Sequence, residues 1–224
     1  MNTISGSPSS TATAGIGWTL AATSFGFVVV QLDVTIVNVA MPKIGANLEA
    51  GAAGLQWIVD AYTLAFAALL LTAGSFADRF GSKRVFSVGL VLFGLASLAC
   101  AAAPSIGLLV AARGAQGIGA ALILPTSLSL LSHACAGDAP ARAYAIGWWS
   151  AIGGVVSAVG PVVGGVLTTG LGWRSIFFVN LPICALGIWA TRHYVTETVR
   201  VAARRLDITG QLLAIAALFF SRIR

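Results

Sequence analysis

Six long apolar stretches dominate this sequence, and they limit what the chain can fold into more than any other feature does. Each has close to the roughly 20 mostly apolar residues that an α-helix needs to cross the hydrocarbon core of a bilayer. The stretches are continuously apolar and lack the short alternating pattern of a transmembrane barrel strand, so we expect helices. They cover approximately residues 17–40, 55–77, 85–103, 106–131, 143–168 and 175–191.

The composition excludes the main soluble alternatives. Hydrophobic residues make up 58% of the chain and charged residues 9%, whereas a soluble domain carries about 25% charged residues. A disordered chain needs low hydrophobicity, which this chain lacks. We also expect no nucleic-acid partner, because the net charge of +6 comes from few side chains in short loops. The sequence therefore predicts an all-α membrane protein whose apolar side chains face the lipid bilayer.

The cysteines and histidines show no pattern of a cofactor site. Cys100, Cys135 and Cys184 are widely spaced, with no C-x-x-C motif and no Cys/His cluster. We interpret them as reduced packing residues and expect no metal and no cofactor. His133 and His193 lie near helix ends and are interpreted as loop or interface residues rather than proton relays. Because the sequence shows no nucleophile–base pair and no phosphate-binding loop, we do not expect an enzyme.

The cations in the loops indicate the orientation in the membrane. Residues 1–16 contain no Lys or Arg, unlike a secretory signal, and we interpret them as a short disordered cytoplasmic tail. With this tail inside, two cations, Lys43 and Arg174, fall in outer loops and eight fall in inner loops, a strong positive-inside bias. We therefore predict a multi-pass protein of the plasma (cytoplasmic) membrane with a cytoplasmic N-terminus. The inner cations are Arg79, Lys83, Arg84, Arg142, Arg192, Arg200, Arg204 and Arg205.

A seventh apolar run follows the six stretches but is too short to cross a bilayer. It covers residues 208–221, and at 1.5 Å per residue it spans about 21 Å of a roughly 30 Å core. We expect residues 17–194 to form a six-helix bundle and residues 195–207 a cytoplasmic linker. Residues 208–224 then form the start of a truncated seventh helix, so we expect the chain to be part of a longer protein.

Three charged residues inside the apolar stretches are the candidate functional residues: Asp33, Asp60 and Arg113. A charge at mid-bilayer costs about 2.5–3.5 kcal/mol on insertion scales and usually marks a functional site. The helix rise places them roughly 12, 8 and 10 Å from the outer helix ends, in one layer of the outer half. We therefore expect the first and fourth helices to bring Asp33 and Arg113 together, with Asp60 nearby.

Two carboxylates and one guanidinium leave one uncompensated negative charge, which suits a proton or a cationic substrate. Burial disfavours an ionised carboxylate and a nearby arginine favours it. Movement of Arg113 relative to Asp33 would therefore change the affinity for a proton. We predict that Asp33 and Arg113 couple to protons and that Asp60 recognises substrate charge. The alternatives are a static ion pair between the first two and, for Asp60, a carboxylate that reaches water.

Residues 74–84 join the second and third stretches. Gly81 allows a positive φ in a tight turn, and Asp78 can accept hydrogen bonds from exposed amides at a helix start. One interpretation is an ordinary positive-inside turn, and the other is a charge latch that locks one conformation. The residues that we predict for a cytoplasmic gating loop are Gly74, Asp78, Arg79, Gly81, Lys83 and Arg84.

The fifth stretch carries small residues around a proline. Gly160, Gly164 and Gly165 allow close approach of helix backbones, and Pro161 removes a backbone hydrogen bond and kinks a helix. A close-packed helix that bends here could seal one side of a transport pathway. Ordinary helix packing is the alternative.

The segment 74–84 resembles the G-x-L-A-D-R-x-G-R-K signature of the major facilitator superfamily, with Phe76 and Ser82 in place of Leu and Arg. Further segments resemble the drug:proton antiporters of that superfamily that have about fourteen helices. Their first-helix motif, second-helix start, fourth-helix motif and fifth-helix antiporter motif resemble residues 32–42, 56–62, 113–121 and 160–165, respectively.

This resemblance implies the six-helix N-terminal half of a major facilitator fold, built from 3+3 inverted repeats. It implies proton-driven export of cationic or amphiphilic drug-like molecules. Arg113 matches the arginine that the family uses in proton coupling, and an aspartate at position 60 is similar to members that export organic cations. The implied partners are a small-molecule substrate, protons, the lipid bilayer, and a missing C-terminal half or a second copy.

Two other hypotheses remain open at this point. The chain could be a truncated, transport-incompetent product, which the DNA beyond codon 224 would test. It could also be a membrane module that acts only by dimerising through the glycine-rich fifth helix, which crosslinking would test.

Overall fold

The computed structural model describes residues 10–198, apart from the side chains of residues 10–14 and 71. Most of the expected linker and all of the expected seventh helix, residues 199–224, lie outside the described residues, as do residues 1–9 of the expected tail. The described part is helical and contains no strand. Its helices are α1 (Ser10–Leu48), α2 (Ala52–Phe80), α3 (Ser82–Ala102), α4 (Ile106–Ala134), α5 (Ala139–Gly170), α6 (Ser175–Phe178) and α7 (Asn180–Tyr194).

Six helical segments of the described chain are long and apolar enough to cross a membrane, with α6 and α7 together forming the sixth. This confirms the predicted all-α membrane protein. The helices are longer than the apolar stretches indicated: α1 begins at Ser10 rather than at Gly17 and continues past Pro42 to Leu48. Proline is tolerated in membrane helices, so Pro42 does not end α1.

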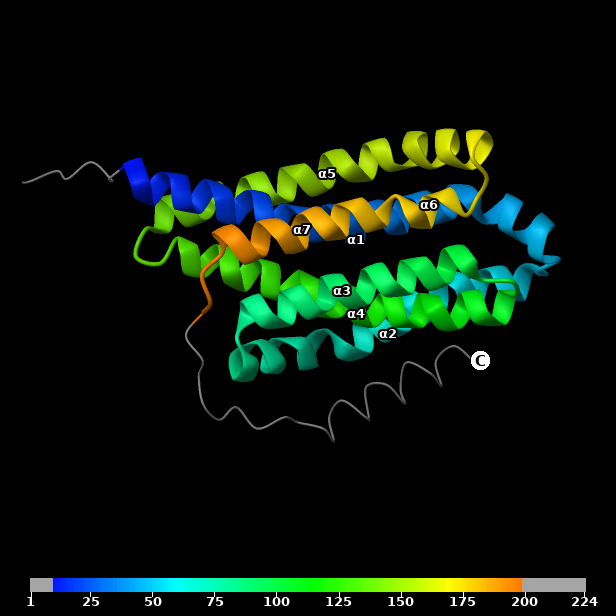
Figure 1. Cartoon of the computed structure of the whole chain (residues 1–224), viewed down its shortest axis with the longest axis horizontal. Coiled ribbons are helices and arrows are strands. Elements are labelled where there is room, and N and C mark those ends of the chain that lie inside the picture. The colour runs from blue at the N-terminus through cyan, green and yellow to red at the C-terminus, as the bar shows by residue number, and fades with distance from the viewer. Residues whose placement is uncertain (1–9, 199–224) are drawn as a thin grey trace, which may run out of the picture.

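The helices lie side by side along the long axis of the bundle (Figure 1). The largest interfaces are those of α4 with α2 and α3 and those of α1 with α5 and α7. Smaller interfaces join α1 to α4 and α3 to α7. We call the end of the bundle that holds the α1–α2, α3–α4 and α5–α6 connections the outer end.

This contact pattern is that of two inverted three-helix repeats. If α1, α2 and α3 correspond to α4, α5 and the α6–α7 helix, the α2–α4 interface corresponds to α5–α1, and α3–α4 corresponds to α7–α1. The α1–α4 and α3–α7 interfaces each correspond to themselves. The repeats have opposite orientations because each contains three crossings. The pseudo-twofold relation therefore brings α1 and α4 together at the centre of the bundle.

The six crossings are covered to very different extents. In an 18-residue apolar segment of each crossing, the buried share is only 11% for α2 and 22% for α5. For the other crossings it is 39–56%. On α5 the exposed side chains include Val155, Val162 and Val166, each exposed by 63–66%. Within residues 10–198, α2 and α5 therefore present the two least covered faces of the bundle.

Candidate functional site

The contact between α1 and α4 contains a buried ion pair. Arg113 donates a hydrogen bond through Nη1 to Oδ2 of Asp33. The two side chains are exposed by only 2% and 0%. A buried charge is tolerated only when it is paired and hydrogen-bonded. The structure therefore brings together the two residues that we predicted to meet, at the centre of the bundle.

Other contacts fix the guanidinium of Arg113. Its Nη1 donates to Oε1 of Gln116 at 2.8 Å, and its Nε donates to the carbonyl oxygen of Ile58 on α2 at 3.3 Å. The guanidinium carbon lies 4.3 Å from the centre of the Tyr62 ring, also on α2. Arg113 thus connects α4 to both α1 and α2, and its position depends on the arrangement of all three helices.

The second carboxylate oxygen of Asp33 accepts hydrogen bonds from two neutral amides. Oδ1 lies 3.2 Å from Nε2 of Gln116 and 2.9 Å from Nδ2 of Asn180. The same two amide nitrogens donate to Oγ of Ser97 at 2.7 and 3.3 Å, respectively. Cys100 completes the set, because its Sγ donates to Oε1 of Gln116 at 3.1 Å. We call these residues the buried polar cluster: Asp33, Ser97, Cys100, Arg113, Gln116 and Asn180.

We predicted no functional role for the neutral members of this cluster from the sequence. Gln116 stands within the segment 113–121, which matched a motif, but Asn180 stood out in no way. One local signal was present, because Pro182 follows Asn180 by two residues. A proline cannot bond to the carbonyl four residues earlier, which here belongs to Phe178. The break between α6 and α7 falls at Val179, directly before Asn180.

Asp60 lies on α2 between Ile58 and Tyr62, the two residues of this helix that contact Arg113. Its side chain is exposed by only 9%. The hydrogen bonds described above for the buried polar cluster run through other side chains. Asp60 is therefore two residues away in sequence from each of the α2 residues that contact Arg113. Its role in substrate recognition stays a prediction.

The expected loop between the second and third crossings is a single residue. Helix α2 continues through Phe80, and α3 begins at Ser82, so only Gly81 is not helical. Its φ is 94°, in the region that favours glycine, as expected. The tight turn that we predicted at Gly81 is present, but the rest of the predicted connection 74–84 is helical, because the two helices continue through its charged residues. Gly74, Asp78 and Arg79 belong to α2, and Lys83 and Arg84 belong to α3.

A residue that the sequence analysis overlooked caps α3. Oε1 of Glu197 accepts a hydrogen bond from the backbone N–H of Lys83 at 2.8 Å, and Oγ1 of Thr198 accepts one from the N–H of Ser82 at 3.0 Å. A Cβ atom on Gly81 would lie 2.6 Å from the Glu197 carboxyl group. We had expected Asp78 to accept from amides at a helix start, but this position belongs to Glu197.

The α1–α5 interface depends on three glycines. A Cβ atom at Gly153 would lie 1.9 Å from the Phe27 ring, and one at Gly160 would lie 1.9 Å from Oγ1 of Thr35. A Cβ atom at Gly164 would lie 3.0 Å from the Cα of Ile36.

Gly165 and Pro161, the two other residues that we predicted for this helix, differ from these three glycines. A Cβ atom at Gly165 would have no atom within 4 Å. Helix α5 is assigned as one continuous element through Pro161, from Ala139 to Gly170. Pro161 therefore does not interrupt the helix, and a kink at this position stays a prediction.

Comparison with known proteins identifies the family. The family model described as the Major Facilitator Superfamily matches residues 23–223. The chain belongs to the major facilitator superfamily. This confirms the resemblance found in the sequence and the assignment to an N-terminal half of that fold.

Several relatives of this superfamily member carry names that refer to drug resistance. The multidrug resistance protein Stp of Mycobacterium tuberculosis is 47% identical over 199 residues, which cover 89% of this chain and 37% of that protein. A methylenomycin A resistance protein of Streptomyces coelicolor is 47% identical over 90% of this chain and 42% of its own length. A puromycin resistance protein of Streptomyces alboniger is 39% identical over 90% of this chain and 40% of its own length. The chain thus spans about two fifths of these relatives.

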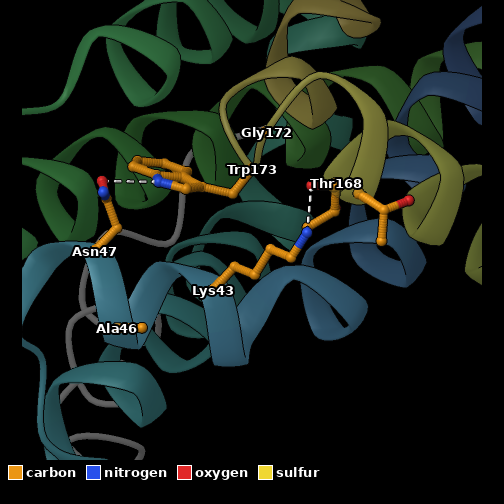
Figure 2. Close-up of a pocket in the computed structure, with 7 residues that line it drawn as sticks. Lys43, Ala46, Asn47, Thr168, Gly172 and Trp173 are labelled. Atoms are coloured by element: carbon orange, nitrogen blue, oxygen red, sulfur yellow. Dashed lines mark hydrogen bonds between the residues drawn. The ribbon is translucent and has the colours of Figure 1, made fainter.

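At the outer end, Lys43 and Trp173 hold α1 against the turn after α5. Figure 2 shows Lys43 pointing toward Thr168, where its Nζ donates to the backbone carbonyl oxygen at 2.8 Å. Nε1 of Trp173 donates to Oδ1 of Asn47 at 3.0 Å. Together with Gly172 these residues line a cavity of about 400 Å³. It lies outside the buried polar cluster, with which it shares no residue.

The two outer cations of this superfamily member have structural partners. Lys43 donates to a carbonyl oxygen in the last turn of α5. Arg174 donates through Nη2 at 3.0 Å to the carbonyl oxygen of Ala103, the C-cap residue directly after α3. Cations stabilise the negative ends of helix dipoles. We therefore interpret Lys43 and Arg174 as residues that cap the C-terminal ends of α5 and α3, respectively.

Proposed function

We propose that this chain is the N-terminal, proton-coupling part of a drug:proton antiporter that exports cationic or amphiphilic molecules. The observation that carries the proposal is the Asp33–Arg113 ion pair, buried where the two inverted repeats meet. The names of the relatives, which refer to multidrug, methylenomycin A and puromycin resistance, support a drug-like substrate. We place the protein in the plasma membrane with its N-terminus in the cytoplasm, because of the bias of loop cations.

The buried pair gives a mechanism for coupling. When Asp33 takes up a proton, Arg113 loses its counter-ion and becomes an unpaired buried charge. Breaking a buried pair costs about 3–5 kcal/mol. Because Arg113 also contacts Gln116, Ile58 and Tyr62, this cost can be relieved by a movement of α4 relative to α1 and α2. Proton binding at Asp33 would thereby favour one conformation of the transporter.

Inward proton movement would supply the driving force for outward export. Each charge that crosses the membrane yields about 2.3 kcal/mol per 100 mV of membrane potential. In this scheme Asp60 attracts the positive charge of the substrate from the same helix, α2, that contacts Arg113. A proton would favour the conformation with neutral Asp33, and a cationic substrate would favour the conformation with ionised Asp33. The two would therefore not be bound at the same time.

The cytoplasmic turn at Gly81 would lock one of these conformations. Glu197, from the segment after α7, holds the first turn of α3 through the backbone of Lys83. Nζ of Lys83 donates in addition to the carbonyl oxygen of Arg192 at 3.2 Å. We propose that Asp78, Arg79 and the basic start of α3 form a charge latch at this turn.

The partly covered faces of α2 and α5 are the places where we propose that the other half of the transporter packs. A substrate pathway between two halves requires a second bundle, and these faces are the least buried in the described chain. A C-terminal half of the same protein is the occupant that we favour, because the relatives are longer than this chain. A second copy of the chain is the alternative.

Export of a cationic dye by the complete protein tests the proposal. Asp33→Asn and Arg113→Ala should each abolish proton-driven efflux from cells or inverted vesicles while the protein still inserts. Glu49→Gln, at an exposed residue of the outer α1–α2 connection, is the matched control and should export normally. Efflux that is unchanged in both Asp33→Asn and Arg113→Ala would reject proton coupling through this pair.

A further inference from the structure

If Asp33 carries protons, as the proposed function requires, its surroundings must accommodate two chemically different side chains. The ionised carboxylate only accepts hydrogen bonds, whereas the protonated carboxyl group also has an O–H that must donate. A buried donor without an acceptor is unfavourable. Among residues 10–198, three side chains form hydrogen bonds with Asp33, and all three donate to it: Arg113, Gln116 and Asn180.

Gln116 cannot supply the acceptor that the protonated form needs. Its Oε1 already accepts from Arg113 at 2.8 Å and from Cys100 at 3.1 Å. Its Nε2 already donates to Asp33 and to Ser97. A half-turn of this amide would turn its oxygen away from two donors and would set an N–H group against the guanidinium. The four hydrogen bonds therefore hold Gln116 in a single orientation.

Asn180 is held on one side only. Its Nδ2 donates to Asp33 at 2.9 Å and to Ser97 at 3.3 Å. Its Oδ1 is buried, and among the described residues it has no hydrogen-bond partner. The residue is exposed by 0%. Since the two ends of an amide are nearly equal in size, a half-turn about the Cβ–Cγ bond exchanges a donor for an acceptor without changing the packing.

We propose that the Asn180 amide turns over when Asp33 changes its protonation state. With Asp33 ionised, Nδ2 of Asn180 donates to Oδ1 of the carboxylate, as observed. When Oδ1 of Asp33 gains a proton from the aqueous pathway, the new O–H donates to Oδ1 of Asn180, and the carboxyl group becomes neutral. In the observed orientation the Ser97 hydroxyl accepts from Nδ2 of Asn180 and donates to the carbonyl oxygen of Phe93 at 2.8 Å. After the half-turn this hydroxyl can redirect its proton to Oδ1 of Asn180, while Nδ2 moves to the buried position in which Oδ1 has no partner among the described residues. Asn180 is thus a positioning residue that acts on the proton site through Asp33.

The other ionisable groups around Asp33 lie on four helices: α2, α3, α4 and α7. They are Arg113 on α4, Tyr62 on α2, Cys100 on α3 and Cys184 on α7. Asp60 lies on α2, two residues before Tyr62. The segment 145–170 of α5 and the short α6 carry no ionisable side chain. Substitution of Asn180 leaves all of these groups in place, so a change in the signals of Asp33 can be assigned to the amide.

Infrared difference spectroscopy of the complete protein in lipid, between high and low pH, tests the proposal. We expect a carboxyl C=O band at low pH that is absent in Asp33→Asn, together with a shifted side-chain amide C=O band that is absent in Asn180→Leu. In Asn180→Leu the Asp33 carboxyl band should move to higher frequency, because its O–H has lost the acceptor. Asn38→Leu, at an exposed asparagine of α1, is the control and should leave both bands unchanged.

The possible outcomes separate this inference from the proposed function. An Asp33 carboxyl band that is unaffected by Asn180→Leu, or that appears without an amide shift, overturns the role of Asn180 and leaves proton coupling intact. Absence of an Asp33 carboxyl band at every pH overturns both.

A second variant covers the case in which Asn180→Leu does not insert into the membrane. Asn180→Ser keeps a group that can donate and accept, so the amide signal should vanish while the Asp33 band keeps its hydrogen-bonded frequency. The pH profile of export should then be closer to wild type than that of Asn180→Ala, which has neither group. Equal profiles for Ser and Ala would contradict the proposal.

Discussion

At the residue scale, the guanidinium of Arg113 does more than neutralise Asp33. It donates to Asp33, to Gln116 and to the carbonyl of Ile58, and it lies over the ring of Tyr62. These contacts come from three helices and use the planar shape of the group. A lysine at this position would keep the charge but would lose the fork of donors and the stacking on the ring.

We therefore predict that Arg113→Lys reduces proton-driven export by roughly tenfold or more, although the net charge is unchanged. Efflux of a cationic dye, normalised to the amount of inserted protein, is the measurement. Arg142→Lys, at an exposed position near the start of α5, is the control and should have little effect. Normal export by Arg113→Lys would show that charge alone matters at this position.

Charged members of the buried polar cluster could be predicted from the sequence, and neutral members could not. Asp33 and Arg113 stand out because a charge inside an apolar stretch has a large cost that needs a reason. Ser97 and Asn180 have a much smaller cost, since a hydroxyl or an amide in a membrane helix can bond to many partners. Their role is set by which helices pack together, and that information is not local in the sequence.

At the element scale, the α1–α5 interface is set by glycines at defined positions. Gly153, Gly160 and Gly164 each face a residue of α1 at a distance that leaves little or no room for a side chain. Gly165 belongs to the same sequence motif but faces no atom within 4 Å. The motif was recognisable from the sequence, but which glycines pack against α1 follows only from the rotation of the two helices.

Gly160→Ala should destabilise the bundle, because the new Cβ would lie 1.9 Å from Oγ1 of Thr35. Overpacking of this kind costs about 1–3 kcal/mol. Thermal unfolding of the purified protein in detergent measures the effect. Gly165→Ala adds the same methyl group on the same helix and should leave the unfolding temperature nearly unchanged. Equal losses in both variants would mean that helix propensity or lipid contacts, rather than contact with α1, explain them.

The start of α3 depends on a side chain more than a hundred positions further along the chain. Glu197 accepts from the backbone N–H of Lys83, and loss of a capping acceptor costs about 1 kcal/mol. We predict that Glu197→Ala increases amide hydrogen exchange in the first turn of α3 by about fivefold. The first turn of α5, where Asp138 caps Ala141, is the internal reference. Unchanged exchange at the start of α3 would remove Glu197 from the proposed latch.

At the scale of the whole molecule, the described chain is a symmetrical unit with two uncovered faces. The interfaces of its first three crossings correspond to those of its last three. In this correspondence α2 is equivalent to α5, and these two helices are the least buried crossings. The number of crossings and the family could be predicted from the sequence, because apolar length and motif spacing are local. The boundaries of α1 and α2 could not, since small and polar residues before Gly17, Lys43 in α1, and Asp78 and Arg79 in α2 continue those helices beyond the apolar stretches.

The occupant of the α5 face can be determined by crosslinking. In a variant without the native cysteines, Val162→Cys, exposed by 66% in the described chain, is labelled with a thiol-attached photocrosslinker that reacts with any neighbouring C–H bond, and it should crosslink within one polypeptide of the complete protein. Leu95→Cys, exposed by 62% on α3, is the lipid-facing control and should not crosslink. A product of twice the monomer mass from Val162→Cys would instead favour a second copy of the chain as the partner.

Substrate-induced proton release tests whether Asp33 carries the proton that is exchanged for the substrate. A cationic substrate such as tetraphenylphosphonium is added to the purified complete protein in weakly buffered detergent, and the released protons are measured with a pH-sensitive dye. We expect release from the wild type and from Glu49→Gln, and none from Asp33→Asn, in which position 33 has no proton to give. Undiminished release from a folded Asp33→Asn protein would rule out Asp33 as the proton site, because the exchanged proton would then reside elsewhere.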